Sequence, residues 1–293
     1  MSDGAPAAVL AIDIGSTRTH IAAVDIRELR LVDRVDFENG GFDAKFPGAV
    51  RKIVNEHPQI GKANISSCVK SLSAKAKELC VRDGGIGDVA IVRARGGLPV
   101  EFRYENQQAL GADRVCNALA CAALFKGENC VIIDSGTAIT VDCLRAGRTF
   151  EGGAILPGCA MQAKALCAGT DALPDIDLRC IDRSDSSVDN GDIVNDIGNV
   201  DNTANTDIIV NKNTTISLPA ASTTACIASG ILYGAAGAVD RCVDECLCGN
   251  YSIGNARIVA TGGGWNILKP LINHTVTTLP NLTLIGAAIF NPD

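Results

Sequence analysis

The chain carries one short pattern twice: an apolar run that ends in an aspartate, followed by a glycine and by hydroxyl residues. Asp13-Ile-Gly-Ser-Thr follows Ala8-Val-Leu-Ala-Ile12, and Asp134-Ser-Gly-Thr-Ala follows Val131-Ile-Ile133. Each copy predicts a buried strand that ends in a carboxylate suited to a hydrated Mg²⁺, next to a glycine that lets backbone N–H groups approach phosphate oxygens. One copy alone is also typical of an ordinary strand-to-turn corner. The pair indicates two facing lobes that hold a metal triphosphate between them.

The composition favours a folded chain without a nucleic-acid or membrane partner. With 293 residues, 47% of them hydrophobic, the chain can bury the core of one large domain or of two similar lobes. Its net charge of -7 and the lack of a long basic run argue against nucleic acid, which requires concentrated Lys and Arg. The first residues lack a secretory signal, and no apolar run approaches the length of a membrane helix. We therefore expect a cytoplasmic protein.

The thirteen cysteines do not indicate a disulfide framework. Their number is odd, no Cys-x-x-Cys pair occurs, and most lie among small apolar residues, so we expect reduced thiols in the core. A thiolate metal site at Cys242, Cys246 and Cys248 is the alternative, but no fourth ligand follows at a zinc-like spacing. The cysteines expected in the core are Cys116, Cys121, Cys159, Cys167 and Cys226.

Two groups of three short strands are expected, and each group begins with one copy of the pattern. Helical segments follow each group, so the sequence predicts an α/β protein with a duplicated architecture and a cleft between its halves. The expected strands are residues 9–12, 20–24 and 29–35 in the first group, and 130–133, 139–141 and 148–150 in the second, which closes at Gly152-Gly-Ala-Ile-Leu-Pro-Gly158.

A helix is predicted after Gly111, because apolar residues recur at 115, 118, 119, 122 and 123, the spacing of an amphipathic helix. Asp113 then lies at the start of this helix. It is either a carboxylate held ionised at the cleft by the field of the helix N-terminus, or an ordinary N-cap with Arg114 as a solvated neighbour. Position and residue type leave both interpretations open.

The segment 177–215 differs from the rest of the chain, with eight Asp and seven Asn. The Asp-x-Asp-x-Asp-Gly order of a Ca²⁺ loop is absent, so we interpret it as an inserted, solvated loop. After it we expect a helix from Thr223 to about residue 246 and a strand at 258–260. The run Gly262-Gly-Gly264 then either admits the adenosine or phosphate side of a nucleotide or is a tight turn.

Taken together, these motifs resemble those of the type III pantothenate kinases. Gly111-Ala-Asp-Arg114 followed by the Asp134 motif is typical of that family, whereas its wider superfamily includes acetate kinases, sugar kinases and actin. The resemblance covers residues 8–178 and 217–290. It implies two actin-like (ribonuclease H-like) lobes, which we place at 1–115 and 116–293, with the insertion at about 178–215. The other matching segments are Tyr104, Gly152-Gly-Ala-Ile-Leu-Pro-Gly158 and Thr261-Gly-Gly263.

The resemblance implies transfer of the ATP γ-phosphate to pantothenate, the first step of coenzyme A biosynthesis, by a homodimer. It implies that Asp113 is the general base and that Thr137 contacts the nucleotide. Asp134 is then the ligand of an activating monovalent cation, K⁺ or NH₄⁺. The implied first phosphate loop is Asp13, Ile14, Gly15, Ser16, Thr17, Arg18, Thr19 and His20, and the implied pantothenate site is Tyr104, Gly111, Ala112, Asp113, Arg114 and Thr223.

One residue departs from the family pattern, and two other functions compete. Ser16 stands where the family usually has Asn; it keeps a donor with a shorter reach, so nucleotide affinity can fall. A sugar kinase or exopolyphosphatase of the superfamily shares the nucleotide clamp, but Tyr104 with the Gly111 motif argues against it. A non-catalytic transcription accessory factor on the same fold has no need of Asp13, Asp113 and Asp134 together.

Overall fold

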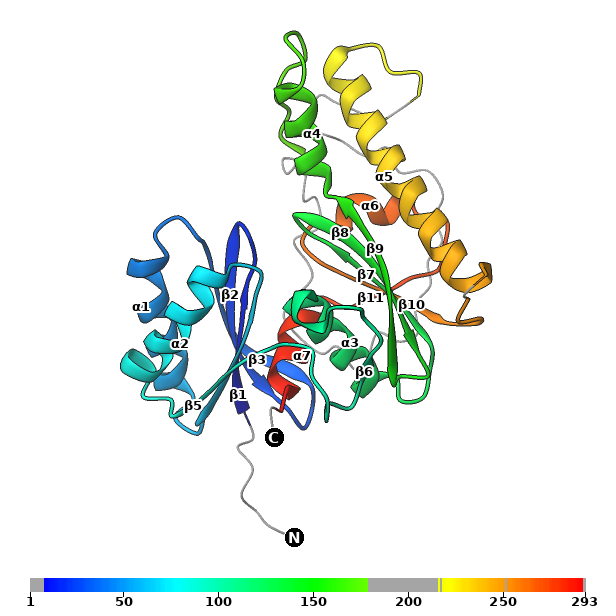
Figure 1. Cartoon of the computed structure of the whole chain (residues 1–293). Helices are drawn as coiled ribbons and strands as arrows, with labels where there is room; N and C mark the ends of the chain where they lie inside the picture. Colours follow the sequence, from blue (N-terminus) through cyan, green and yellow to red (C-terminus); the bar gives the residue numbers. More distant parts are fainter. Residues whose placement is uncertain (1–7, 179–215, 217, 251, 292–293) are drawn as a thin grey trace. The chain divides into compact units, whose positions relative to one another are not determined.

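The computed structural model describes residues 8–178, 216, 218–250 and 252–291 (Figure 1). Its Cα packing gives two compact units. The first takes in Met1–Cys130, Leu144–Gly152 and Asn281–Asp293, and the second Val131–Cys143 and Gly153–Pro280. This division does not follow the lobe boundary expected at residue 115, which stays a prediction. Most of the expected insertion at 178–215 lies outside the described residues.

The first unit is built on a five-stranded sheet with the order β3-β2-β1-β4-β5. The strands β1, β2 and β3 form an antiparallel meander, and β4 and β5 add to β1 in parallel. The helices α1 and α2 pack on each other, and Phe46 and Ile53 of α1 lie in the buried core. The elements are β1 (Ala8–Ile14), β2 (Arg18–Asp25), β3 (Arg30–Glu38), α1 (Phe42–Glu56), β4 (Lys62–Ser67), α2 (Lys70–Gly84) and β5 (Asp88–Ile91).

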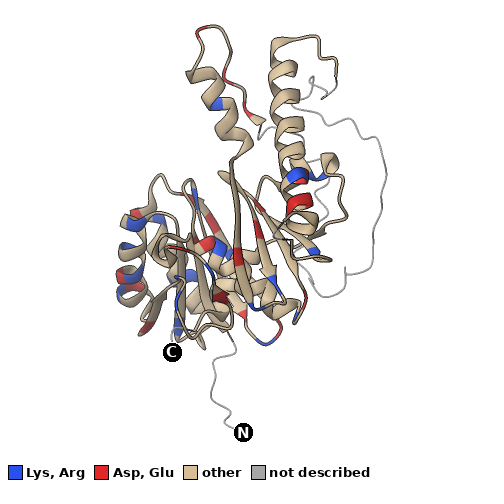
Figure 2. Ribbon diagram, turned by 45° about the vertical axis from the view of Figure 1, so that its right-hand side comes forward, with Lys and Arg blue, Asp and Glu red and all other residues tan. Residues whose placement is uncertain are grey.

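Charged residues on α1 and α2 form ion pairs between the two helices. Arg51 lies 2.7 Å from Asp83, and Lys75 lies 2.5 Å from Asp43. Figure 2 shows blue and red segments interspersed along these two helices. Exposed pairs of this kind contribute about 0 to 1 kcal/mol each, so the packing of α1 on α2 depends mainly on its apolar residues.

Two helices from distant parts of the sequence complete the first unit. Helix α3 (Ala112–Leu124) packs against α7 (Leu282–Ile289), where Gly286 lies against the backbone of Cys116 with no room for a Cβ. The buried Asn64 amide donates to the carbonyls of Ala287 and Phe290 at 2.8 Å and so fixes the end of α7 to β4. The remaining short elements are β6 (Glu101–Phe102) and η1 (Gln107–Ala109).

The second sheet has the order β11-β10-β7-β8-β9-β6. Read from β9, the order β9-β8-β7-β10-β11 repeats the order β3-β2-β1-β4-β5 of the first sheet. This repetition confirms the predicted duplication. Each expected strand overlaps an observed one, although those expected at 29–35 and 148–150 begin one residue before β3 and β9. The strands are β7 (Cys130–Ser135), β8 (Ala138–Arg145), β9 (Thr149–Pro157), β10 (Arg257–Thr261) and β11 (Thr277–Thr278).

The segment Gly152–Gly158 does not close the second group of strands, contrary to our expectation. It is largely the second half of β9, which continues to Pro157. The strand requires a glycine at position 153, because a Cβ there would collide with the carbonyl oxygen of Val141 on the neighbouring strand.

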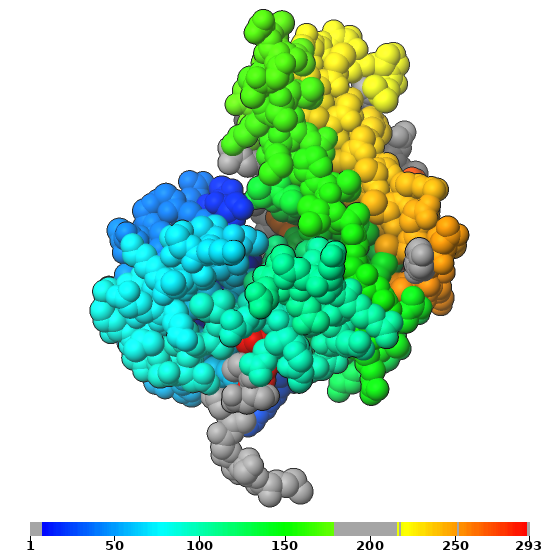
Figure 3. Space-filling model, viewed as in Figure 1, coloured from blue at the N-terminus to red at the C-terminus, as the bar shows by residue number. Residues whose placement is uncertain are grey.

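The helices of the second unit are α4 (Cys159–Ala168), α5 (Thr223–Cys248) and the short α6 (Trp265–Leu268), followed by η3 (Lys269–Leu271). Helix α4 packs on α5, as Figure 3 shows in green and yellow. Contrary to the sequence-based expectation, α5 is long and apolar enough to cross a membrane by length and composition. However, 56% of its most apolar stretch is buried, and Leu232 and Val239 lie in the core, so α5 also fits a core helix.

The described cysteines form no disulfide, but not all of them are core residues. Cys116 and Cys121 are buried as expected, and burial raises the pKa of both thiols. Cys159 and Cys167 are half-buried. The expectation for Cys226 was wrong: it is exposed on the first turn of α5, and the buried residues of that helix begin only with Ile227.

Candidate active site

Asp13 lies near the end of β1, between a neighbour on each side. It is opposite His20 on β2 and Ser66 on β4, and the Ser66 hydroxyl donates to its Oδ1 at 3.0 Å. Burial, and after it the nearby carboxylate of Asp113, raise the pKa of Asp13 to about 6, although His20, the Ser66 hydrogen bond and Arg34 act in the opposite direction. Asp13 and Asp113 are half-buried carboxylates that repel each other, and a divalent cation bound near them would relieve this repulsion.

The turn after Asp13 is held by side-chain hydrogen bonds. The N–H of Gly15 donates to the carbonyl of Arg18 at 2.9 Å, and the Asn39 amide donates to the carbonyl of Gly15 at 2.8 Å. Thr19 in turn donates to the Asn39 side chain at 2.7 Å. Asn39, which directly follows β3, therefore fixes the turn. Ser16, Thr17 and Arg18 are exposed, so a ligand can reach the tip of the turn, whereas Ile14 and Thr19 are buried.

His20 belongs to a charged group behind this turn. Its Nδ1 lies 2.8 Å from Oδ1 of Asp36, which also accepts from Nε of Arg34 at 2.7 Å. Burial by itself raises the pKa of Asp36, but the hydrogen bonds to His20 and Arg34, together with their electrostatic attraction, outweigh this effect and lower the pKa to about 2. Asp36 is therefore ionised at neutral pH. It orients the ring of His20, which lies opposite Asp13 on the neighbouring strand β2.

Asp113 lies in the first turn of α3 but does not cap the helix. The N-cap residue is Gly111, and Asp113 Oδ1 accepts from the N–H of Arg114 at 2.8 Å. Its Oδ2 accepts from the Cys68 thiol at 3.4 Å. A Cβ at Gly111 would collide with Oδ1, so the glycine leaves room for the carboxylate. The N-cap interpretation was therefore wrong, and the predicted helix is confirmed.

Arg114 is buried, so its interpretation as a solvated residue was wrong. It is 5% exposed, and its guanidinium lies 5.6 Å from the ring centre of Tyr104 and 5.4 Å from that of Phe150. Its Nη1 also lies 3.5 Å from the Tyr104 hydroxyl. Cation–π contacts stabilise a buried guanidinium and restrict its orientation. The structure thus brings together Tyr104 and Arg114, two of the residues predicted to bind substrate.

The turn after Asp134, in the second unit, is surrounded by glycines. The N–H of Gly136 donates to the carbonyl of Ala138 at 2.9 Å, and Gly158 donates to the carbonyl of Thr137 at 3.0 Å. Gly262 has a φ of +94°, and a Cβ there would lie 2.6 Å from Oδ1 of Asp134. The glycine run after β10 therefore forms a tight turn whose backbone packs directly on the Asp134 turn. Thr137 is exposed.

Thr223 is the first residue of α5 and is exposed. Ser222 caps the helix by accepting from the N–H of Ala225 at 3.2 Å, which confirms the predicted start. Of the predicted site residues, those from 13 to 20, Tyr104 and 111–114 lie in the first unit. Asp134, Thr137 and Thr223 lie in the second.

Four residues of the site escaped the sequence analysis. Ser66 contacts Asp13, and Cys68 contacts Asp113. The sequence could have indicated both, because they lie at or just after the carboxyl end of β4, and parallel neighbouring strands bring their carboxyl ends together. Asn39 and Phe150 left no signal, because each reaches the site through pairing of strands that are distant in sequence.

A family model described as type III pantothenate kinase matches residues 9–197. The chain belongs to this family. A type III pantothenate kinase from Legionella pneumophila strain Corby is 27% identical over 97% of this chain and 99% of its own length. One from Geobacillus thermodenitrificans is 27% identical over 95% of each chain. A third, from Rubrobacter xylanophilus, is 33% identical over 66% of this chain and 61% of its own.

Solved structures with little sequence identity share the fold. A Baf family transcriptional activator from Campylobacter jejuni superposes with a TM-score of 0.52 at 17% identity, covering 94% of each chain. The activator of 2-hydroxyisocaproyl-CoA dehydratase from Clostridium difficile, solved with bound ADPNP, gives 0.50 at 14% identity and covers 96% of this chain and 92% of its own. The predicted duplicated α/β fold of the actin type is therefore confirmed.

Proposed function

We propose that this chain transfers the γ-phosphate of ATP to the primary hydroxyl of pantothenate and forms 4'-phosphopantothenate, the first step of coenzyme A biosynthesis. Family membership supports the activity. The observation that carries the assignment to this chain is the pair of interacting carboxylates, Asp13 on β1 and Asp113 on α3, beside the buried Arg114.

Asp113 is the proposed general base. Hydrogen bonds from the Arg114 N–H and the Cys68 thiol hold its carboxylate, and Gly111 leaves space around it. A carboxylate is a weak base toward an alcohol. In a loose phosphoryl-transfer transition state, however, the hydroxyl proton leaves late, so orientation matters more than basicity.

Arg114 and Tyr104 are the proposed binding residues for pantothenate, together with Gly111, Ala112 and Thr223. The guanidinium is restrained by Tyr104 and Phe150, so little side-chain entropy remains to be lost when it donates to a carboxylate. Pantothenate carries such a carboxylate, and a planar fork of donors matches its geometry better than an ammonium group does.

Residues 13–20 and Thr137 are the proposed nucleotide contacts. The exposed tip of the first turn offers the hydroxyls of Ser16 and Thr17, and the raised pKa of Asp13 fits a carboxylate that a divalent cation relieves of repulsion. Mg²⁺ neutralises phosphate charge when bound. Asp134 is the proposed ligand of an activating K⁺ or NH₄⁺, and the proposed assembly is a cytoplasmic homodimer.

A coupled assay of ADP release tests this function. We expect ADP formation that depends on pantothenate and Mg²⁺, with one 4'-phosphopantothenate found by mass spectrometry for each ADP. ADP release with glucose or glycerol, and none with pantothenate, would assign the chain to the sugar kinases. No ADP release with any acceptor, despite measurable binding of ATP, would favour the non-catalytic regulator.

A further inference from the structure

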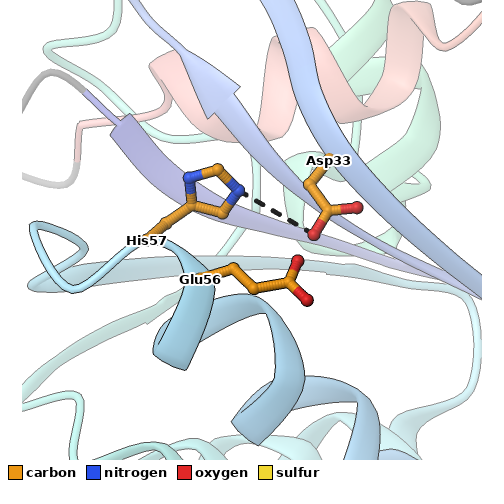
Figure 4. A group of neighbouring side chains, drawn as sticks. All are labelled: Asp33, Glu56 and His57. Carbon is orange, nitrogen blue, oxygen red and sulfur yellow. Dashed lines mark ion pairs between the residues drawn. The ribbon is translucent and has the colours of Figure 1, made fainter.

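Three side chains away from the proposed active site form a group with the composition of a metal site. Asp33 on β3 and Glu56 and His57 at the end of α1 each offer one ligand atom, and these atoms lie within 4.8 Å of one another (Figure 4). We propose that Asp33, Glu56 and His57 bind a divalent transition-metal cation, Zn²⁺ being the probe we choose. This proposal does not depend on the proposed kinase activity.

The distances allow such a cation after a small adjustment. Nε2 of His57 lies 3.8 Å from Oδ2 of Asp33. Bonds of about 2.0 to 2.2 Å to Zn²⁺ at a tetrahedral angle place two ligand atoms roughly 3.3 to 3.5 Å apart, so the two side chains must close by a few tenths of an ångström. Figure 4 shows the Glu56 carboxylate beside this pair. Being exposed, Glu56 can turn toward the cation and leave a fourth position for water.

A second observation points to a ligand at Asp33. Its Oδ1 accepts from the N–H of Arg34 at 2.7 Å, which fixes the carboxylate and directs Oδ2 toward His57. Oδ2 is buried and accepts no hydrogen bond from any part of the chain that the structure describes. His57 is too distant to donate a hydrogen bond to it. A buried acceptor without a hydrogen-bond donor is costly, and a cation at this place satisfies it.

His57 is rigidly placed for coordination. Its N–H donates to the carbonyl of Ile53 at 2.9 Å, and its own carbonyl accepts from the N–H of Ile60 at 3.0 Å. Its side chain is 17% exposed, so a hydrated ion can still reach the ring. One imidazole with two carboxylates favours late first-row divalent ions over Ca²⁺ and Mg²⁺, which prefer oxygen ligands alone. The two carboxylates balance the charge of the ion.

The chain contains a matched group that lacks these features. His274 lies 3.2 Å from Asp244 and 4.0 Å from Asp240. Both oxygens of Asp240, however, accept from Asn273, at 3.1 and 3.2 Å from its backbone N–H and at 2.6 Å from its side chain. Within the described residues this group does not bring three ligand atoms within 4.8 Å, and we expect it to remain an ordinary ion pair.

The consequence of metal binding follows from the place of the ligands. Asp33 lies on β3, an edge strand of the first sheet, and His57 immediately follows α1. A bound cation ties the end of the helix to the edge of the sheet, and it stabilises the folded state because the unfolded chain does not hold the ligands together. It is therefore a stabilising site, with no role in phosphate transfer.

The test is a Zn²⁺ titration of the full chain labelled with ¹⁵N in histidine. The chain has three histidines, so each ring gives a resolvable signal, and Zn²⁺ taken up by cysteine thiols does not move them. The Nε2 signal of His57 is identified by its loss in His57→Gln. We expect this signal to shift when one Zn²⁺ is bound per chain, and we expect the melting temperature of the chain to rise. Asp33→Asn and Glu56→Gln should each weaken this binding by roughly tenfold or more.

The control is the His274 group. Asp244→Asn should leave the response of His57 to Zn²⁺ unchanged, and the His274 signal should not shift at the concentration that saturates His57. The proposal is overturned if the His57 ring does not respond, if His274 responds equally, or if Asp33→Asn binds as the parent does. Far-ultraviolet circular dichroism without Zn²⁺ serves as the folding check, and we expect every variant here to give the spectrum of the parent.

Discussion

The Asp13 and Asp134 turns occupy equivalent places in two sheets of the same strand order, yet they are held in different ways. In both, the carbonyl of the residue after the aspartate accepts a hydrogen bond from the loop after a neighbouring strand, which is β4 in the first sheet and β10 in the second. Cys68 N–H donates to Ile14 at 3.1 Å, and Gly264 N–H donates to Ser135 at 2.8 Å. The backbone frame is thus common to both turns, and the surroundings differ.

The conformation of the first turn depends on hydrogen bonds from polar side chains, whereas that of the second depends on glycines that leave room for close backbone packing. Asn39 and Ser66 donate to Gly15 and Asp13, respectively, in the first turn. In the second, Gly158 and Gly262 lie so close to the turn that a Cβ would collide with it. A duplicated frame can therefore diverge into one turn sensitive to loss of hydrogen-bonding groups and another sensitive to a single added methyl group.

The strongest test of the first turn's chemistry is Asp113→Asn, since Asp113 is the carboxylate that Asp13 faces. The amide keeps the size and removes the basic oxygen, so we expect kcat to fall by roughly 10² to 10⁴ with ATP binding little changed. Steady-state kinetics and ATP titration measure the two effects. If the variant unfolds, and its folded fraction keeps full specific activity, then Asp113 only supports the helix.

The second turn should break on addition of one methyl group. Gly262→Ala places a Cβ against the Ser135 carbonyl at a φ of +94°, and we expect a loss of about 2 to 4 kcal/mol in the free energy of unfolding. Gly263→Ala is the matched control, because a Cβ there meets nothing within 4 Å. Urea denaturation of the two variants measures the difference. Equal stabilities would remove close packing as the explanation.

The raised pKa of Asp13, which burial and repulsion by Asp113 cause, should make both the stability of the fold and the binding of metal depend on pH. The pKa of Asp13 is raised to about 6, so the folded state binds a proton there that the unfolded state releases near pH 4. Its contribution to stability without metal is therefore present below about pH 4 and is lost as the pH rises through 6.

Mg²⁺ requires the ionised carboxylate, so the opposite trend is expected for the affinity for Mg²⁺ and ATP. It should fall about tenfold for each pH unit below 6. Isothermal titration with parent and Asp13→Asn measures this, and the variant should lose the dependence in that range. A parent that binds equally well at pH 5 and pH 7 would show that Asp13 does not meet the metal.

The sequence predicted what is local and periodic. The strands β1 and β7, which end one residue after Asp13 and Asp134, follow from continuous apolar runs, and the helix after Gly111 follows from its 3.6-residue period. Their duplication followed from the repeated motif, because similar local patterns build similar sheets.

What the sequence did not predict depends on contacts between distant segments. From the sequence, Arg114 is expected to be a solvated neighbour of Asp113, whereas in the structure its guanidinium lies against the rings of Tyr104 and of Phe150 on β9. The length of β9 also depends on a neighbour, because Gly153 fits against Val141 of β8. Such pairs have no signal in a single sequence, since nothing local distinguishes a buried arginine from an exposed one.

Ser16→Asn is the smallest change we consider, and it tests how far the polar side chains of the first turn determine nucleotide affinity. Ser16 is exposed at the tip of the turn, and the longer amide restores the residue that the family usually has there. We expect one additional hydrogen bond to ATP, on the order of 0.5 to 1.5 kcal/mol, and a lower KM for ATP with kcat unchanged. Thr137→Asn at the second turn should give no such gain. An unchanged or raised KM in Ser16→Asn would mean that the turn already supplies this hydrogen bond by another group.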